Sequence, residues 1–95
     1  MKFVGIIEYI QDKEKIQEIR PVHRQYLATL KANGQLAAAG PLTDDSGACI
    51  IYEAASREDA EKLLQGDPFH QNGIFVRWQL WSWNPVIANR DLFPA

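Results

Sequence analysis

The order of strand-like and helix-like segments is the feature that most constrains how this chain can fold. Four stretches are rich in β-branched and aromatic side chains and are predicted to be strands: residues 2–10, 36–42, 48–55 and 74–83. One helical pattern runs from Asp12 to Gly34, between the first two, and another from Ser56 to Gly66, between the last two. This order predicts a two-layer α+β sandwich with the ferredoxin-like βαββαβ arrangement, whose helices cover one face of the sheet.

The first helix carries an apolar stripe, and its spacing decides which residues face the sheet. The stripe recurs at helical intervals and consists of Ile16, Ile19, His23, Tyr26, Leu27 and Leu30. Pro21 falls on the opposite, solvent side, where we expect it to kink the helix or to begin a second segment. After the second helix, Asp67-Pro68-Phe69 and a polar loop to Gly73 lead into the last strand.

Length and composition favour one small domain. The chain has 95 residues, enough for a single core, with 46% hydrophobic and 23% charged residues. Its formal net charge is -2 and the basic residues are scattered, which argues against a nucleic-acid partner. The only cysteine, Cys49, cannot form an intrachain disulfide, and no apolar run approaches the ~20 residues that cross a bilayer. We expect a cytoplasmic protein without membrane contact, with one domain over residues 1–83 and a tail over residues 84–95.

We expect the sheet face away from the helices to be too apolar to stay fully exposed to water. We assign two sets of side chains to opposite faces of the last strand: Ile74, Val76, Trp78 and Leu80 to one, and Phe75, Arg77, Gln79, Trp81 and Trp83 to the other. Soluble monomers seldom expose large apolar patches, and interfaces are enriched in aromatic residues. We therefore expect a homodimer, with the tail packing on the partner subunit. A tail that folds back over its own sheet is the alternative.

His23 is the titratable residue whose position suggests a role in proton transfer. It lies in the middle of the apolar stripe, between Ile19 and Leu27, so it faces the sheet rather than water. An imidazole takes up or releases a proton near neutral pH, especially when a carboxylate lies beside it. From position alone, a core histidine with one satisfied hydrogen bond is the simpler explanation.

The predicted topology brings other residues to His23. The first strand, the second strand and the second helix all end at the edge where the first helix begins. That edge gathers Tyr9, Arg20, Gly40-Pro41 and Asp67-Pro68-Phe69 near the half of the helix that carries His23. A carboxylate just past a helix C-terminus is disfavoured by the helix dipole, so Asp67 needs a partner, which Arg20 or His23 can supply. The alternative is a turn aspartate that does no more than precede a proline.

Several motifs taken together resemble the YCII-related (YciI-like) proteins. They span roughly residues 1–83 and consist of Arg20-x-x-His23, Lys31-Ala32-Asn33-Gly34, Ala39-Gly40-Pro41-Leu42 and Asp67-Pro68-Phe69. The resemblance implies a dimeric α/β barrel of ferredoxin-like subunits, with a pocket that holds a His and Asp pair proposed as catalytic. It carries these roles to His23 and Asp67, and a dehydrochlorinase-like lyase activity is known among relatives.

We therefore predict a small dimeric enzyme that transfers protons, by elimination or isomerisation, on a small aromatic or cyclic organic substrate. His23 is the expected general base or acid, Asp67 its orienting partner, and Arg20 a contact for a substrate anion or for Asp67. Three residues are expected to wall the pocket: Tyr9, Pro41 and Phe69. The histidines and Cys49 lack metal-ligand spacing and no phosphate loop is present, so we expect no metal or other cofactor. The competing hypothesis is a non-catalytic dimeric module that binds small molecules, in which the pair only supports the core.

Overall fold

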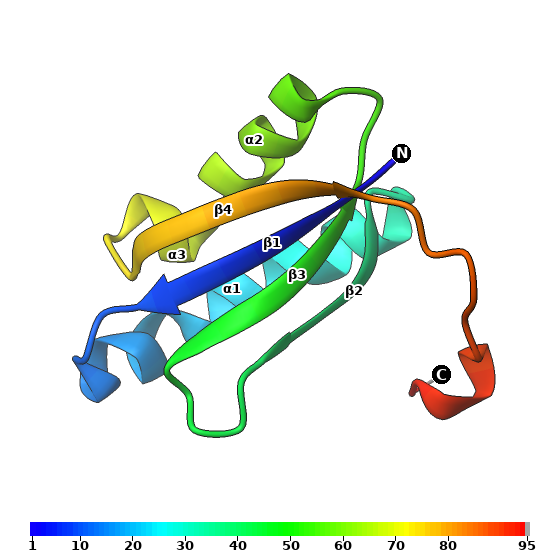
Figure 1. Ribbon diagram of the computed structural model, residues 1–95. Coiled ribbons are helices and arrows are strands. Elements are labelled where there is room, and N and C mark those ends of the chain that lie inside the picture. The colour runs from blue at the N-terminus through cyan, green and yellow to red at the C-terminus, as the bar shows by residue number, and fades with distance from the viewer. Residues whose placement is uncertain (95) are drawn as a thin grey trace.

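The order of elements agrees with the sequence (Figure 1). A computed structural model describes residues 1–94 and has the following elements: β1 (Lys2–Tyr9), α1 (Lys13–Ala32), β2 (Leu36–Pro41), β3 (Gly47–Glu53), α2 (Arg57–Gln65), α3 (Pro68–Gln71), β4 (Phe75–Trp83) and the 3-10 helix η1 (Arg90–Leu92). The four strands form one antiparallel sheet in the order β2-β3-β1-β4, which is the ferredoxin-like arrangement. The predicted α+β fold is confirmed. Among the described residues, no helix has both the length and the apolarity needed to span a bilayer.

The sheet buries one face against the helices and leaves the other open. In β1 the side chains of Phe3, Ile7 and Tyr9 are buried, whereas Ile6 on the opposite face is 51% exposed. The helices lie on the far side of the sheet in the view of Figure 1. One core forms between the two layers, and its most deeply buried members include Ile16, Ile50, Tyr52, Leu64, Phe69 and Ile74.

A bulge between β1 and β4 changes the alternation expected for the last strand. Tyr9 pairs with Phe75, whereas the register of the preceding residues would place it opposite Val76. Phe75 is therefore buried, as is Ile74 next to it, and Val76 is 45% exposed. The faces predicted for Phe75 and Val76 are wrong, because a bulge leaves no trace in a simple alternating pattern.

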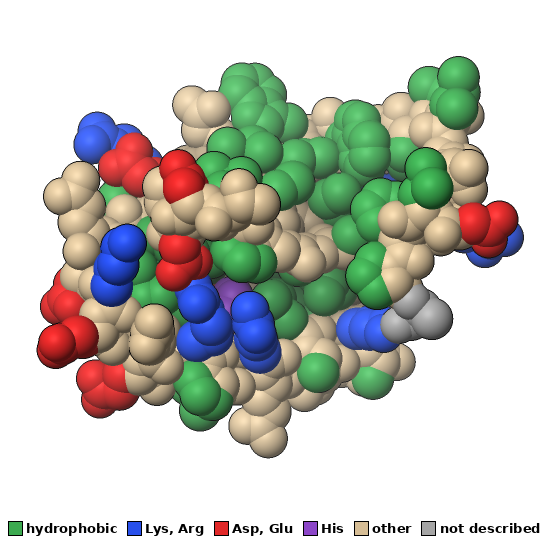
Figure 2. Space-filling model, turned by 90° about the horizontal axis from the view of Figure 1, so that it is seen from below, with side chains coloured by type: hydrophobic (Ala, Val, Ile, Leu, Met, Phe, Trp, Pro, Cys, Tyr) green, Lys and Arg blue, Asp and Glu red, His purple; other side chains and the backbone are tan. Residues whose placement is uncertain are grey.

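The open face and the tail carry exposed apolar side chains. The register places Val4, Ile51 and Trp81 side by side across the three strands β3, β1 and β4. Trp81 remains 57% exposed. After Trp83 the tail runs away from the sheet (Figure 1), and it exposes Val86, Ile87, Leu92 and Phe93. Figure 2 shows hydrophobic side chains gathered over one side of the molecule, with most charged side chains over another.

One of the two alternatives for Pro21 is excluded, and the loop predicted after the second helix is corrected. α1 is one continuous helix that passes through Pro21, whose missing N–H falls on the exposed side, so no second segment begins there. The residues after α2 form the short helix α3 instead of a polar loop. Asp67 caps this helix and Pro68 occupies its first turn, a pair of residues that favours a helix start.

Contacts at the sheet edges tie neighbouring elements together. Arg57, the first residue of α2, donates a hydrogen bond to the backbone carbonyl of Leu80 in the edge strand β4, at 2.6 Å. At the end of β3, Glu53 accepts from the terminal ammonium of Met1 at 2.8 Å and lies 2.9 Å from Nζ of Lys2. These two cations hold the pKa of the Glu53 carboxyl below its usual range.

Gly47 marks a point where the sheet has no room for a side chain. A Cβ at this position would overlap the backbone carbonyl of Ile7 in β1. We predict that Gly47→Ala lowers the free energy of unfolding by about 2–4 kcal/mol, because strand pairing must shift to relieve the overlap. Urea denaturation measures the loss. The control is Gly40→Ala on β2, where nothing lies within 4 Å of the new Cβ, and it should change stability by less than about 0.5 kcal/mol. Equal losses in the two variants would contradict this account.

Candidate active site

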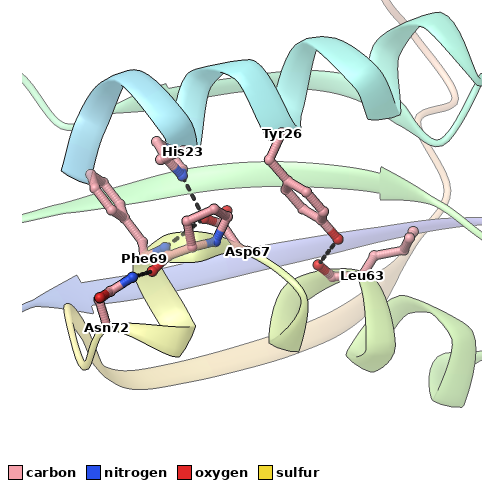
Figure 3. Close-up of polar contacts among 7 residues, drawn as sticks. His23, Tyr26, Leu63, Asp67, Phe69 and Asn72 are labelled. Carbon is pink, nitrogen blue, oxygen red and sulfur yellow. Dashed lines mark hydrogen bonds and ion pairs between the residues drawn. The ribbon is translucent and has the colours of Figure 1, made fainter.

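His23 lies on the buried face of α1 and is held by a carboxylate (Figure 3). The residue is 5% exposed, as its place in the apolar stripe predicts. Its Nδ1 lies 2.7 Å from Oδ1 of Asp67, which stands between α2 and α3. The predicted proximity of these two residues is confirmed, and their chemical roles remain predictions. We refer to the pair as the dyad.

Asp67 has no exposed surface and is fixed by the start of α3. Its Oδ1 accepts a hydrogen bond from the backbone N–H of Phe69 at 2.9 Å, in addition to the contact with His23. The carboxylate therefore lies at the N-terminus of α3, where backbone N–H groups favour it, and not simply past the C-terminus of α2. Its second oxygen, Oδ2, has no hydrogen-bond partner within residues 1–94.

The bonds of Asp67 determine which nitrogen of His23 is available. An ionised carboxylate only accepts hydrogen bonds, so Nδ1 carries the hydrogen that it shares with Oδ1. The lone pair of the neutral ring is then on Nε2. Within the described residues the ring bonds through Nδ1 alone, and 7% of the side chain is exposed. The dyad thus presents one nitrogen that can accept a proton.

Aromatic rings fix the orientation of the imidazole. Phe69 stacks on the ring of His23 with centroids 3.8 Å apart and planes at 3°. Phe75 meets the same ring edge-on at 6.4 Å, and Tyr9 packs against Phe69 at 5.4 Å. The sequence predicts Tyr9 and Phe69 near the site but misses Phe75, which only the bulge in β4 turns inward.

Arg20 bonds a different carboxylate from the one expected. Its Nη2 lies 2.6 Å from Oδ1 of Asp45 in the β2–β3 loop, and both side chains are partly buried. Of the two contacts predicted for Arg20, the one with Asp67 is therefore wrong, and the one with a substrate anion stays a prediction. Asp45 is the residue that sequence reasoning misses, since Asp44-Asp45-Ser46-Gly47 indicates only a turn. Pro41 lies exposed at the end of β2, paired with Ala48.

An open recess of about 1060 Å³ lies where β1 ends. Its wall includes Tyr9, Asp45, Ser46, Arg77 and Trp78. Neither member of the dyad lines this recess, and the ring of Tyr9 is the contact between the recess and the aromatic cluster around His23. Among residues 1–94, no three side chains of His, Cys, Asp or Glu are placed to hold a metal ion together.

The charges of both the dyad and the Arg20 ion pair affect the pKa of Tyr9. The pKa of Tyr9 is raised to about 12, chiefly by burial; the carboxylates of Asp45 and Asp67 add to the rise, and the guanidinium groups of Arg20 and Arg24 oppose it. The phenol is therefore neutral, and a hydrogen-bond donor, at physiological pH.

Two more tyrosines border the buried carboxylate. Burial raises the pKa of both Tyr26 and Tyr52, and the charge of Asp67 adds to the effect. Tyr26 donates its hydroxyl hydrogen to the carbonyl of Leu63 at 2.6 Å, which links α1 to α2 (Figure 3). Both phenols stay neutral at physiological pH, so neither adds a negative charge near Asp67.

Comparison with known proteins gives the family. The family model of the YCII-related domain matches residues 1–84. The protein belongs to the YCII-related family. A search of curated proteins finds no match. Among solved structures, the 5-chloro-2-hydroxyhydroquinone dehydrochlorinase TftG from Burkholderia phenoliruptrix AC1100, in complex with 2,5-dihydroxybenzoquinone, is similar: it is 26% identical, with 88% of this chain and 94% of that chain covered and a TM-score of 0.78.

The site of this YCII-related domain has the groups needed for the transfer of a proton. The free Nε2 of His23 can take a proton, and the carboxylate of Asp67 can stabilise the positive charge that the ring then gains. The stacked Phe69 prevents the ring from turning away. The arrangement is therefore suited to general acid–base chemistry, with all parts of the dyad inside the matched residues 1–84.

We predict that His23→Leu lowers the free energy of unfolding by about 3 kcal/mol or more, because it leaves Asp67 buried without its side-chain partner. His23→Asn should lose far less, since its amide can still donate to Oδ1 from near the position of Nδ1. Urea denaturation of the two variants measures the difference. The double variant His23→Leu/Asp67→Asn should recover part of the loss, because the buried charge is gone. A leucine variant as stable as wild type would show that the carboxylate does not depend on His23.

Proposed function

We propose that this protein is a small enzyme of lyase type, in which His23 transfers a proton on a small hydroxylated aromatic or quinoid compound. The observation that carries the proposal is the dyad: Nδ1 of His23 is bound to a fully buried carboxylate, which leaves Nε2 as the reactive nitrogen. Asp67 orients the ring and stabilises its protonated form. No cofactor is required for this chemistry.

The surroundings of the dyad suit a flat, acidic ring. Tyr9 lines the recess and supplies aromatic surface, and its neutral phenol supplies a hydrogen-bond donor. Phe69 is fully buried and supports the imidazole of His23. Arg20 supplies a positive charge for a substrate oxyanion. Pro41 is proposed as an outer wall, because it immediately precedes Leu42, which lines the recess.

The likeness to a dehydrochlorinase supports elimination of HCl as the reaction type. In such a reaction on a chlorinated hydroxyhydroquinone, two hydroxyl protons are lost and one proton is delivered to the carbon that carries chlorine. The C–Cl bond breaks with its electron pair, and chloride and a hydroxyquinone are formed with no net oxidation. His23 can remove a hydroxyl proton and return it to carbon, which is the transfer that one free imidazole nitrogen can perform.

The proposal includes a homodimer in the form of an α/β barrel. The open sheet face carries a row of apolar side chains across three strands, centred on Val4, Ile51 and Trp81. A second copy that covered this face would bury on the order of 200 Å² for each tryptophan. The exposed apolar side chains of the tail, residues 84–94, would pack on the partner subunit, because they contact no apolar surface of their own chain strongly enough to be buried.

A non-catalytic binding module remains a second candidate, and one observation favours it. Neither His23 nor Asp67 lines the open recess, and Asp67 is fully buried. In that case the dyad stabilises the core and the recess alone binds a ligand. The two candidates differ in whether the imidazole is needed for turnover.

We predict that wild-type protein releases chloride from 5-chloro-2-hydroxyhydroquinone and that His23→Asn lowers the rate by about 100-fold or more, because the variant lacks the free nitrogen. Ion chromatography of chloride measures the rate under anaerobic conditions, which exclude oxidation of the substrate by air. The matched control is Gln25→Asn, an exposed change on the same helix. Turnover that persists in folded His23→Asn would contradict the proposed role of His23, and ligand binding without any turnover in wild type would favour the module.

We predict that the wild-type protein contains two chains at micromolar concentration and that Trp81→Lys shifts it to single chains, because a charge then replaces the centre of the apolar row. Multi-angle light scattering measures the mass. Val22→Lys, on the outer surface of α1 where Val22 is 47% exposed, is the control and should leave two chains. Deleting residues 84–94 should raise the concentration at which the dimer dissociates. A wild-type mass of one chain throughout this range would rule out the dimer.

A further inference from the structure

The ion pair between Arg20 and Asp45 joins the middle of α1 to the β2–β3 loop. The two side chains meet at 2.6 Å, with 21% and 29% of their surfaces exposed. Partly buried pairs of this kind keep a more defined geometry than pairs in open water. Arg20 lies one helical turn before His23 on α1, so the guanidinium is held on the same side of the helix as the dyad.

The loop that carries Asp45 is itself rigid. The carboxylate of Asp44 accepts hydrogen bonds from the backbone N–H of Ser46 at 3.0 Å and from its hydroxyl at 2.7 Å. The N–H of Asp45 donates to the carbonyl of Leu42 at 2.8 Å, which closes the turn. The loop is also fastened to β1, because the N–H of Tyr9 donates to the carbonyl of Ser46 at 2.9 Å. The carboxylate of Asp45 is therefore fixed relative to Tyr9.

Asp45 occupies a backbone conformation that is unusual for a residue with a side chain. Its φ is 62°, in the left-handed region, where glycine is the most favoured residue and asparagine and aspartate are the best tolerated of the others. A glycine would satisfy the turn at lower conformational cost. Unlike a glycine, the aspartate supplies the carboxylate that binds Arg20.

The pair stands at the boundary between the recess and the dyad. Asp45 and Tyr9 both line the recess of about 1060 Å³. The charges of Arg20 and of Asp67 both act on the phenol of Tyr9. Asp45 accepts a hydrogen bond from one nitrogen of the guanidinium, Nη2. The other N–H groups of the arginine can donate to a second acceptor.

Arg20 does not line the recess itself, but it bonds Asp45, which does. We propose that Asp45 is a positioning residue that fixes Arg20 at the margin of the recess as its anion-binding group, so that Arg20 and the Tyr9 hydroxyl together hold the oxyanion of an acidic, planar hydroxyquinone. This inference deepens the proposed function and rests on it. It assigns the recognition of the charged ring oxygen to Arg20 and Tyr9, and leaves the proton transfer to His23. It also explains a carboxylate at the entrance of a site for anions: its role is to orient a cation.

The test is a double-mutant cycle with 2,5-dihydroxybenzoquinone as the probe, an anion at neutral pH whose visible absorbance reports binding. Arg20→Met should weaken binding about tenfold or more. Asp45→Gly removes the carboxylate at a conformation that glycine adopts freely, and should weaken binding about threefold to tenfold. In the Arg20→Met background the same Asp45→Gly change should alter binding by less than about twofold, because Asp45 affects binding only by positioning Arg20.

Two further variants separate positioning from simple charge. Asp45→Asn keeps an oxygen that can accept from Arg20 and tolerates the left-handed backbone, so it should bind the probe at least as well as wild type. Glu8→Gln is the matched control: Glu8 also lines the recess and pairs with an arginine, Arg77, at 3.5 Å, but does not touch Arg20. Loss of its negative charge should leave binding of an anion unchanged or make it tighter.

The outcomes separate this inference from the proposed function. Tighter binding by Asp45→Gly, or an equal loss in the wild-type and Arg20→Met backgrounds, would overturn the role of Asp45. Binding by wild type that Arg20→Met leaves unchanged would overturn the anion subsite, while turnover that depends on His23 would still stand. A wild-type protein that turns over 5-chloro-2-hydroxyhydroquinone but does not bind the quinone would also overturn the subsite. Thermal melts of every variant establish that each is folded.

Discussion

The contact between His23 and Asp67 is the interaction on which the rest of the site depends. A carboxylate with no exposed surface is costly to keep charged unless several donors reach it. Here the donors are an imidazole from α1 and a backbone N–H from the first turn of α3. One oxygen atom therefore fixes how the long helix packs on the segment that leads into β4. The stacked ring of Phe69, held by the same turn, then sets the plane of the imidazole.

Much of this arrangement could be predicted from the sequence, and the reasons are physical. The segment order allowed one common topology, and that topology brings the ends of β1, β2 and α2 to the start of α1. The helical period placed His23 inward, and the position of Asp67 next to that edge made their contact predictable. Alternation and spacing carry such information because they reflect which side of an element is buried.

The features that were missed depend on single-residue irregularities. The bulge opposite Tyr9 moves Phe75 from the open face to the dyad, and no periodic pattern marks it. The short helix α3 has too few residues to show a period, although Asp67-Pro68 is a start signal that could have been recognised. The partner of Arg20 could not be predicted because Asp44, Asp45 and Asp67 all lie at the same sheet edge, and only the folded β2–β3 loop brings Asp45 within 2.6 Å.

The two charged pairs differ in their surroundings, and this difference suggests separate tasks. The side chains of the dyad are almost fully shielded from water, so small changes in charge there have large electrostatic effects. The pair of Arg20 and Asp45 is partly hydrated and borders an open recess, where a ligand can exchange with water. Tyr9 lies between the two and remains a neutral donor, since burial keeps its pKa at about 12. In the proposed function, mutation should therefore alter ligand binding and proton transfer independently.

Arg57 also protects the sheet from growing at its edge. The outer side of β4 is a free row of backbone groups, which in other proteins recruits further strands and leads to aggregation. The guanidinium of Arg57 donates a hydrogen bond to the carbonyl of Leu80 within that row. It also places a charge where an incoming strand would have to pair. At the opposite edge, β2 ends in Pro41, which has no N–H to offer. Both edges thus resist the addition of a fifth strand, which favours the proposed association through the face of the sheet over polymerisation along its edge.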